Sequence, residues 1–225
     1  MPEPRTTADP LVTAWNDALD RLGGRDPARR TLAAVRDAYR EPHRRYHDAG
    51  HLRAVVTATA AATDSGDGPS PHLVLAACYH DVVYDPRRGD NEAASAARAV
   101  EELAACGIDA ADAARVAAAV EATAHIGGAT TTPAEVGPLL DADLAVLGSA
   151  PGSYRRYAAQ VRAEYAHVSD GDWLTGRAEV LRVLADGELF ATPGGRERYA
   201  AAAHRNLRWE LGELAAGRIC GRDGR

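Results

Sequence analysis

Residues 73–81 read LVLAACYHD, an apolar run that ends in an adjacent histidine and aspartate. Ser70 and Pro71 stand in front of it and predict the N-cap and the first residue of a helix. On that helix His80 shares a face with the apolar residues, so we expect its imidazole to be buried. An ionised Asp81 beside it, away from water, is costly without a partner. Either a metal ion or an internal network of hydrogen bonds and ion pairs supplies that partner.

Composition and periodicity favour a single all-α domain over residues 1–225. Hydrophobic residues make up 46% of the chain and charged residues 26%, as in ordinary globular proteins, and the apolar share is carried by alanine, the best helix former. No segment alternates apolar and polar residues as a strand would. Helical spacing, caps and breakers predict helices at about 8–22, 26–39, 71–84, 91–107, 109–125, 139–147, 152–168, 172–186 and 195–216. Residues 43–51 lead into a further helix that lasts to about residue 63.

Charge and hydropathy exclude several classes of protein. The net charge of -6 argues against binding of extended nucleic acid, which needs a basic face. No apolar run approaches the 18 residues of a membrane span, and no signal-peptide core opens the chain, so we expect a cytoplasmic protein with no membrane association. The three cysteines, Cys78, Cys106 and Cys220, are odd in number and widely spaced, which favours reduced thiols.

Two further stretches carry groups suited to metal or acid–base chemistry. His47 and His51 are four residues apart, a spacing that on a helix stacks both imidazoles on one face. This predicts a ligand pair, or a ligand beside an acid, although surface histidines also adopt this spacing. Asp143 shares a helix face with leucines, so it is a candidate metal ligand or an arginine-paired structural residue. Asp141 is rotated away from that face and is interpreted as a supporting residue or a cap.

The order of these groups resembles the HD superfamily of metal-dependent phosphohydrolases. Tyr46–His51 is similar to the YHNxxH stretch of class I cyclic-nucleotide phosphodiesterases, with Asp48 where they have Asn. A closer resemblance is to a family of stand-alone bacterial HD proteins, with patterns such as HRxYHxxxH, FHDxVYD and LDADLxxLG. Here Tyr79 replaces the usual Phe of FHDxVYD. The family also has a TxxH segment, which is one residue tighter here at Thr123–His125, and a C-terminal ARxNLxxE, in which His204 replaces the Ala. The similarity spans about residues 12–215, with its motif core at about 43–148 and its C-terminal helices at about 152–216.

The resemblance implies an HD-type helical bundle and a hydrolase that cleaves a phosphomonoester or phosphodiester, including that of a nucleotide. It assigns the metal to four ligands, His51, His80, Asp81 and Asp143, with Asp81 able to bridge a second ion. It makes His47 the acid that protonates the leaving group. The implied cofactor is one or two divalent ions, Mn, Fe, Co, Ni or Zn, with Mg also compatible with the ligands.

Three more residues are candidates for contacts with substrate or with the groups around the metal. Arg44 lies beside the metal-binding stretch, and a guanidinium suits phosphate. Glu92 either orients a water at the metal or favours a helix N-terminus. His125 is a candidate further ligand or phosphate contact. At least one of Arg44 and Arg45 is expected to be a solvated surface charge.

Two other functions are compatible with the same residues. One is an HD-type di-iron oxygenase, which needs more histidines than the four-ligand set supplies, with His125 as the obvious extra donor. The other is a non-catalytic module that keeps a metal and binds a nucleotide. The sequence leaves the substrate and the oligomeric state open, and the Ala-rich C-terminal helix can pack internally or against a second copy in a homo-oligomer.

Overall fold

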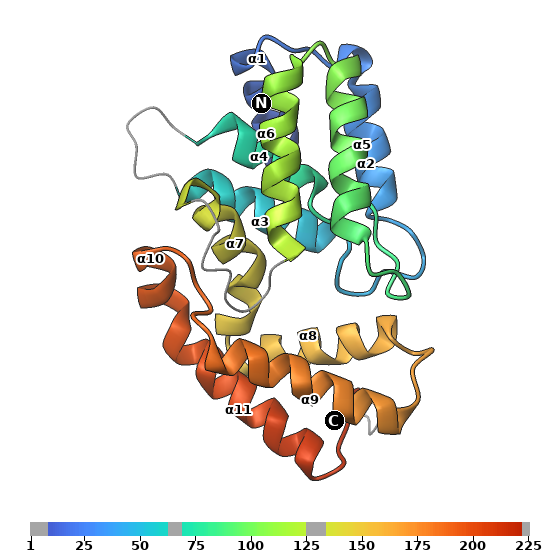
Figure 1. Ribbon diagram of the computed structural model, residues 1–225, viewed down its shortest axis with the longest axis vertical. Helices are drawn as coiled ribbons and strands as arrows, with labels where there is room; N and C mark the ends of the chain where they lie inside the picture. Colours follow the sequence, from blue (N-terminus) through green and yellow to red (C-terminus); the bar gives the residue numbers. More distant parts are fainter. Residues whose placement is uncertain (1–8, 63–68, 125–133, 222–225) are drawn as a thin grey trace, which may run out of the picture.

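The computed structural model describes residues 9–62, 69–124 and 134–221, and these residues form helices and connecting turns with no strand (Figure 1). The all-α prediction is therefore confirmed. In chain order the elements are α1 (Pro10–Arg21), η1 (Pro27–Arg29), α2 (Arg30–Ala38), α3 (Ala49–Ala61), α4 (Pro71–Tyr79), α5 (Asn91–Ala105), α6 (Ala110–Glu121), η2 (Ala122–Ala124), η3 (Ala134–Val136), α7 (Gly137–Leu144), η4 (Ala145–Gly148), α8 (Pro151–Glu164), α9 (Asp170–Asp186), α10 (Pro193–Gly195), η5 (Arg196–Ala200) and α11 (Ala201–Ala215).

Helix α4 is the centre of the N-terminal part of the molecule. Every residue from Leu73 to Tyr79 is buried, and the helix packs against α1, α3, α5, α6 and α7. A helix that is apolar on all sides is stable only when other helices surround it. The sequence predicted a helix end near Tyr84, and this was wrong: the helix gives way to turns at His80. It is also buried on all sides, beyond the one apolar face noted in the sequence. Ser70 occupies the N-cap position, but its hydroxyl makes no capping bond.

The buried apolar side chains form two clusters that follow each other along the chain. The first runs from Leu11 to Ala142 and the second from Leu147 to Ile219. Figure 1 shows the corresponding halves, with α1–α7 in the upper part and α8–α11 in the lower part. Tyr46 belongs to the N-terminal half by sequence but packs on the second cluster, with its ring centroid 4.6 Å from that of Tyr157. The segment around residue 46 therefore lies where the halves meet.

Some predicted helices begin or change type at residues that the periodicity does not reveal. The helix expected from residue 26 begins at Arg30, because Ala28 and Arg29 have φ of 61° and 54°. Asp26 instead accepts bonds from the amides of Thr31 and Leu32, which are in the first turn of α2. The helix predicted at 195–216 opens with a π-helical turn, η5, before α11.

Gly148 allows η4 to lie directly against η5. A Cβ at this position would be 2.7 Å from Tyr199 Cβ and 2.9 Å from its Cα and carbonyl oxygen, and backbone cannot move aside cheaply. We expect Gly148→Ala to lower the free energy of unfolding by about 1–3 kcal/mol, measured by urea denaturation. The control is Gly176→Ala in α9, where a Cβ meets nothing within 4 Å and alanine is expected to be neutral or stabilising. Equal effects of the two substitutions would contradict the close approach.

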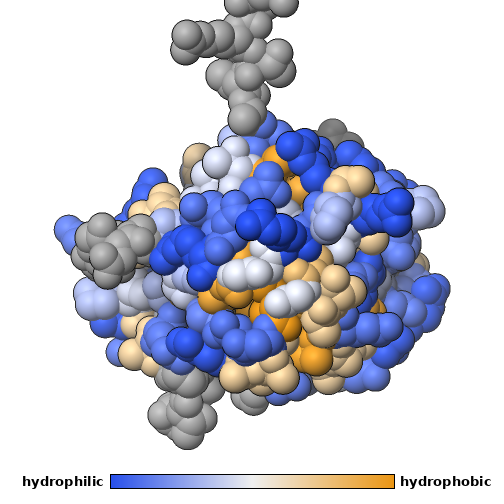
Figure 2. Space-filling model, turned by 90° about the horizontal axis from the view of Figure 1, so that it is seen from above, coloured by the Kyte–Doolittle hydropathy of each residue, from blue (hydrophilic) through white to orange (hydrophobic). Residues whose placement is uncertain are grey.

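Within the described part of the chain, no helix combines the length and the hydropathy that crossing a membrane requires. Figure 2 shows the molecule from above, with hydrophilic side chains around a smaller group of apolar ones. Cys78, Cys106 and Cys220 are free thiols, as expected.

Candidate metal centre

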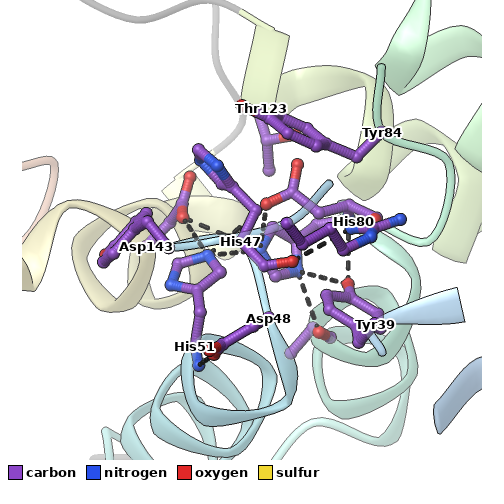
Figure 3. A network of polar contacts seen from close by, with 12 residues as sticks. Tyr39, His47, Asp48, His51, His80, Tyr84, Thr123 and Asp143 are labelled. Atoms are coloured by element: carbon purple, nitrogen blue, oxygen red, sulfur yellow. Dashed lines mark hydrogen bonds and ion pairs between the residues drawn. The ribbon is translucent and has the colours of Figure 1, made fainter. Parts of the chain in front are cut away.

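Four side chains from three elements converge at the inner end of α4. His51 comes from the first turn of α3, His80 and Asp81 follow α4 directly, and Asp143 lies in the last turn of α7. One ligand atom from each of the four lies within 4.8 Å of every other. Figure 3 shows His51, His80 and Asp143 turned toward one another. The four residues predicted as ligands are thus brought together, and they form a buried cluster that can hold a metal ion.

The distances between the ligand atoms suit a single ion. His51 Nε2 lies 3.0 Å from His80 Nε2, 3.2 Å from Asp143 Oδ1 and 3.4 Å from Asp81 Oδ2. His80 Nε2 lies 3.2 Å from Asp81 Oδ2. Ligands about 2.1 Å from a common ion are about 3.0 Å apart at right angles and about 3.4 Å apart at tetrahedral angles. These four separations fit ligands around one ion, and His80 Nε2 and Asp143 Oδ1 lie further apart, at 3.7 Å.

The tautomer of His80 directs a lone pair into the cluster. Its Nδ1–H donates to the Ala77 carbonyl oxygen at 2.9 Å, so in the neutral ring Nε2 carries the lone pair. A histidine ligand held by its other ring nitrogen in this way is the usual arrangement at metal centres. Two neutral Nε2 atoms 3.0 Å apart would repel each other, because each would point a lone pair at the other. A cation between them, or a proton on one of them, removes the repulsion.

The electrostatics of the cluster favour a cation. Burial alone would lower the pKa of His51, but hydrogen bonds and charge from Asp143 and Asp81 outweigh it and raise the pKa to about 9. Burial likewise opposes ionisation of the two carboxyl groups, yet His80 and His51 hold the pKa of Asp81 and of Asp143 below the usual range. Two ionised carboxylates at a buried site attract a proton when no metal is present, and a divalent ion competes with that proton.

Tyr39 and Asp48 fix the backbone that carries the ligands. The Tyr39 hydroxyl accepts a hydrogen bond from the amide of Asp81 at 3.1 Å and lies 3.4 Å from His80 Nδ1. Asp48 is the N-cap of α3, and its side chain accepts from the amides of Gly50 and His51. These bonds hold the backbone of the first turn of α3 and of the segment just after α4 in place.

His47 lies beside the cluster, but for a different reason than predicted. The four-residue spacing stacks His47 and His51 only if both lie on one helix, whereas α3 begins at Ala49 and His47 precedes the N-cap. Helical stacking therefore does not bring the two rings together. The two ring centroids are nevertheless 5.5 Å apart, and the His47 ring also stacks on Tyr84 at 4.3 Å. The position of the His47 ring is set by the turn that enters α3 and by contacts with Tyr84 and Glu164.

The main partner of His47 is Glu164, at the C-terminal end of α8. His47 Nδ1–H donates to Glu164 Oε2 at 2.8 Å, and the same oxygen accepts from the Tyr84 hydroxyl at 2.9 Å. The other oxygen, Oε1, accepts from three consecutive amides, those of Arg45, Tyr46 and His47. One buried carboxylate thus ties the second half of the molecule to the turn before α3. Among the described residues, His47 Nε2 has no hydrogen-bond partner.

Glu164 should make the stability of the protein depend on pH below 5. Burial opposes its ionisation, but the His47 hydrogen bond and charge, with the amides of Arg45 and Tyr46, lower its pKa from 4.5 to about 2. Because the pKa is lower in the folded state, this stabilisation is complete above pH 4.5 and is lost as the pH falls toward 2. It amounts to about 3 kcal/mol.

The measurement is urea denaturation of the parent protein and of Glu164→Gln at pH 7 and at pH 3. We expect the parent to be more stable than the variant at pH 7 and the difference to shrink at pH 3. A difference that stays constant between the two pH values would contradict the ionised, multiply bonded Glu164.

Arg44, predicted as a contact to substrate, is buried and fully engaged in the structure. Its guanidinium donates to the carbonyl oxygens of His47, Asp81 and Val82 at 2.8–3.2 Å and to Glu41. In the structure it therefore positions the backbone of the site. Arg45 is exposed, in line with the expectation that one of the two is a surface charge.

The other candidate residues lie outside the four-ligand cluster. Glu92 is half-buried in the first turn of α5 and is not one of the clustered donors. His125 lies outside the described residues. Asp141 is buried, and it accepts from the amides of Ala191 and Thr192 and from the Thr192 hydroxyl. It thus caps the chain that enters α10, which agrees with its interpretation as a cap.

Sequence reasoning missed Glu164, the residue that holds His47. Its signal was weak but present: a glutamate three residues after Val161 and seven after Tyr157, next to the apolar face of the predicted helix at 152–168. Tyr84 and Tyr39, which complete the hydrogen bonds around the site, also went unassigned. Searches with this chain matched no family model, no curated protein and no solved structure, so the interpretation of the site rests on its geometry.

Proposed function

We propose that this protein is a metal-dependent phosphohydrolase of the HD type that cleaves a phosphomonoester or phosphodiester, such as that of a nucleotide. The observation that carries the proposal is the buried donor set of two imidazoles and two carboxylates, with a third imidazole held beside it. Donors of this kind bind divalent Mn, Fe, Co, Ni or Zn. The sequence motifs that resemble HD phosphohydrolases coincide with these same residues.

The side chains supply three functions in this reaction. A divalent ion bound by His51, His80, Asp81 and Asp143 would activate water and polarise a phosphoryl oxygen. His47 holds a proton at Nε2 and delivers it to the oxygen of the leaving group, because its Nδ1–H is kept on Glu164. Glu164 fixes the orientation of the ring. In this proposal His47 is the general acid and Glu164 is the carboxylate that positions it.

The di-iron alternative finds less support in the geometry. Among the described residues the cluster contains four donors, of which two are histidines. His47, a candidate further donor, lies beside this set but is not one of the clustered donors. The four-donor arrangement thus favours hydrolytic chemistry.

The test is phosphate release from a panel of phosphate esters and nucleotides, with the protein loaded in turn with each of the five metals and with Mg. We expect turnover by the parent and its loss in Asp81→Asn. His47→Gln should keep the bound metal and lower kcat by about 100-fold or more, since it removes only the acid. If the metal-loaded parent releases no phosphate from any substrate, the hydrolase proposal is wrong. If it instead consumes oxygen with iron bound, the oxygenase is favoured.

A further inference from the structure

A hollow in the C-terminal half of the molecule lies away from the metal centre. It has a volume of about 340 Å³ and is bounded by the connection between η4 and α8, by the first turns of α8 and by one side of α11. Helices α8 and α11 both pack on η4 (Figure 1), so the walls are held by the second apolar core. None of the four clustered donors lines it. The hollow is therefore separate from the metal centre.

The charged side chains that line the hollow are all cationic. Arg155 and Arg205 contribute guanidinium groups, and none of the lining residues is acidic. Within the described chain Arg205 has no ion-pair or hydrogen-bond partner. Arg155 lies over the Trp209 ring at 4.9 Å and has no carboxylate oxygen within 4.0 Å. Glu213, whose charge also interacts with Arg155, has both oxygens engaged by Arg218. Two guanidinium groups at one hollow therefore remain available to an anion.

Other groups in the wall also suit an anion with an apolar part. The Ser149 hydroxyl is buried and has no hydrogen-bond partner in the described structure. Asn206 donates to the carbonyl oxygens of Leu147 and Ser149, which keeps this wall rigid. Helix α8 begins here with Ala150 at its N-cap, which offers no side-chain acceptor to the first amides. Trp209 adds a half-buried indole, the type of surface on which flat rings pack.

We propose that this hollow binds a nucleoside monophosphate, with the phosphate at Arg155 and Arg205 and the base against Trp209. Guanidinium groups bind phosphate through paired N–H donors, and the volume is that of a small-molecule site. The hollow contains no general base and no metal-binding donor set, so the nucleotide is bound there without being cleaved. This site goes beyond the proposed hydrolase and does not depend on it.

The test is calorimetric titration of AMP into protein kept metal-free with a chelator, which removes any contribution of the metal centre. We expect saturable binding of one AMP per chain. The double variant Arg155→Ala/Arg205→Ala should weaken it by about tenfold or more. Its matched control is Arg156→Ala/Arg208→Ala, which removes the same charge from exposed positions of the same two helices outside the hollow. The control should change the Kd by less than twofold.

Further titrations measure how much the phosphate and the nucleoside of AMP each contribute to binding, and whether the metal centre takes part. Inorganic phosphate and adenosine should each bind at least tenfold more weakly than AMP. His80→Ala should bind AMP as the parent does. The proposal is overturned if metal-free parent protein binds no AMP, if the two double variants weaken binding equally, if phosphate alone binds as tightly as AMP, or if His80→Ala abolishes binding.

Discussion

Replacing His80 with alanine is expected to lower the affinity for a divalent metal by a factor on the order of 100 or more. Changes to groups that only support a ligand cost about 10–100-fold, and His80 supplies one of the four donor atoms itself. In the parent, a metal at 100 times its Kd should add about 2.7 kcal/mol to the free energy of unfolding. For a chain of this length that corresponds to a Tm increase of about 5–10 °C. We expect His80→Ala to lose this increase.

The chain offers a matched control on the same helix. His72 lies at the start of α4, and its Nε2 is paired with Asp112 at 2.7 Å, away from the cluster. His72→Ala removes the same side chain and should retain the Tm increase with Mn²⁺ or Zn²⁺, measured by thermal denaturation with and without chelator. An equal increase in His80→Ala and the parent would mean that the metal binds elsewhere.

The second large effect is expected from Arg44→Ala, compared with Arg45→Ala. The Arg44 side chain is fully buried, and its loss leaves three backbone carbonyl oxygens without their charged donor. We expect a decrease of about 3–5 kcal/mol in the free energy of unfolding. Arg45 is exposed, so Arg45→Ala should change it by less than about 0.5 kcal/mol. Urea denaturation of both variants measures the difference.

This comparison also tests which function Arg44 has. If Arg44 served mainly to bind the phosphate of a substrate, Arg44→Ala would raise KM and leave the stability of the protein nearly unchanged. That result would contradict the structural function seen here. If the carbonyl oxygens of His47 and Asp81 depend on Arg44, the variant should also bind metal more weakly, because both residues belong to the site.

The fold class and the residues of the candidate metal centre could be recognised in the sequence because their signals are local. Alanine-rich helical spacing indicated an all-α chain, and the apolar run ending at His80 and Asp81 identified the helix that proved to be central. Asp143 was recognisable as a carboxylate on an apolar helix face. Each of these observations needed only the periodicity of one helix and the cost of burying a charge. Their grouping with His51 as one ligand set came from the resemblance to HD phosphohydrolases.

What could not be predicted depends on contacts between distant parts of the chain. Glu164 lies 117 residues after His47, and nothing in the spacing of either segment indicates that they meet. The same holds for Arg44, whose burial follows from the carbonyl oxygens that the turn after α4 presents to it. Asp141 likewise caps a segment about 50 residues further on. Such side-chain-to-backbone bonds are set by tertiary packing, which helical periodicity does not report.

The most direct test of the metal centre is anomalous X-ray scattering from crystals of the protein grown with Mn²⁺ or Zn²⁺. The account predicts one strong peak within about 2.3 Å of His51 Nε2, His80 Nε2 and a carboxylate oxygen of Asp81 and of Asp143. A second, weaker peak beside Asp81 would indicate a bridged pair of ions and agree with it. Crystals in which no ion lies among these four residues, with the two histidines instead sharing a proton, would contradict it.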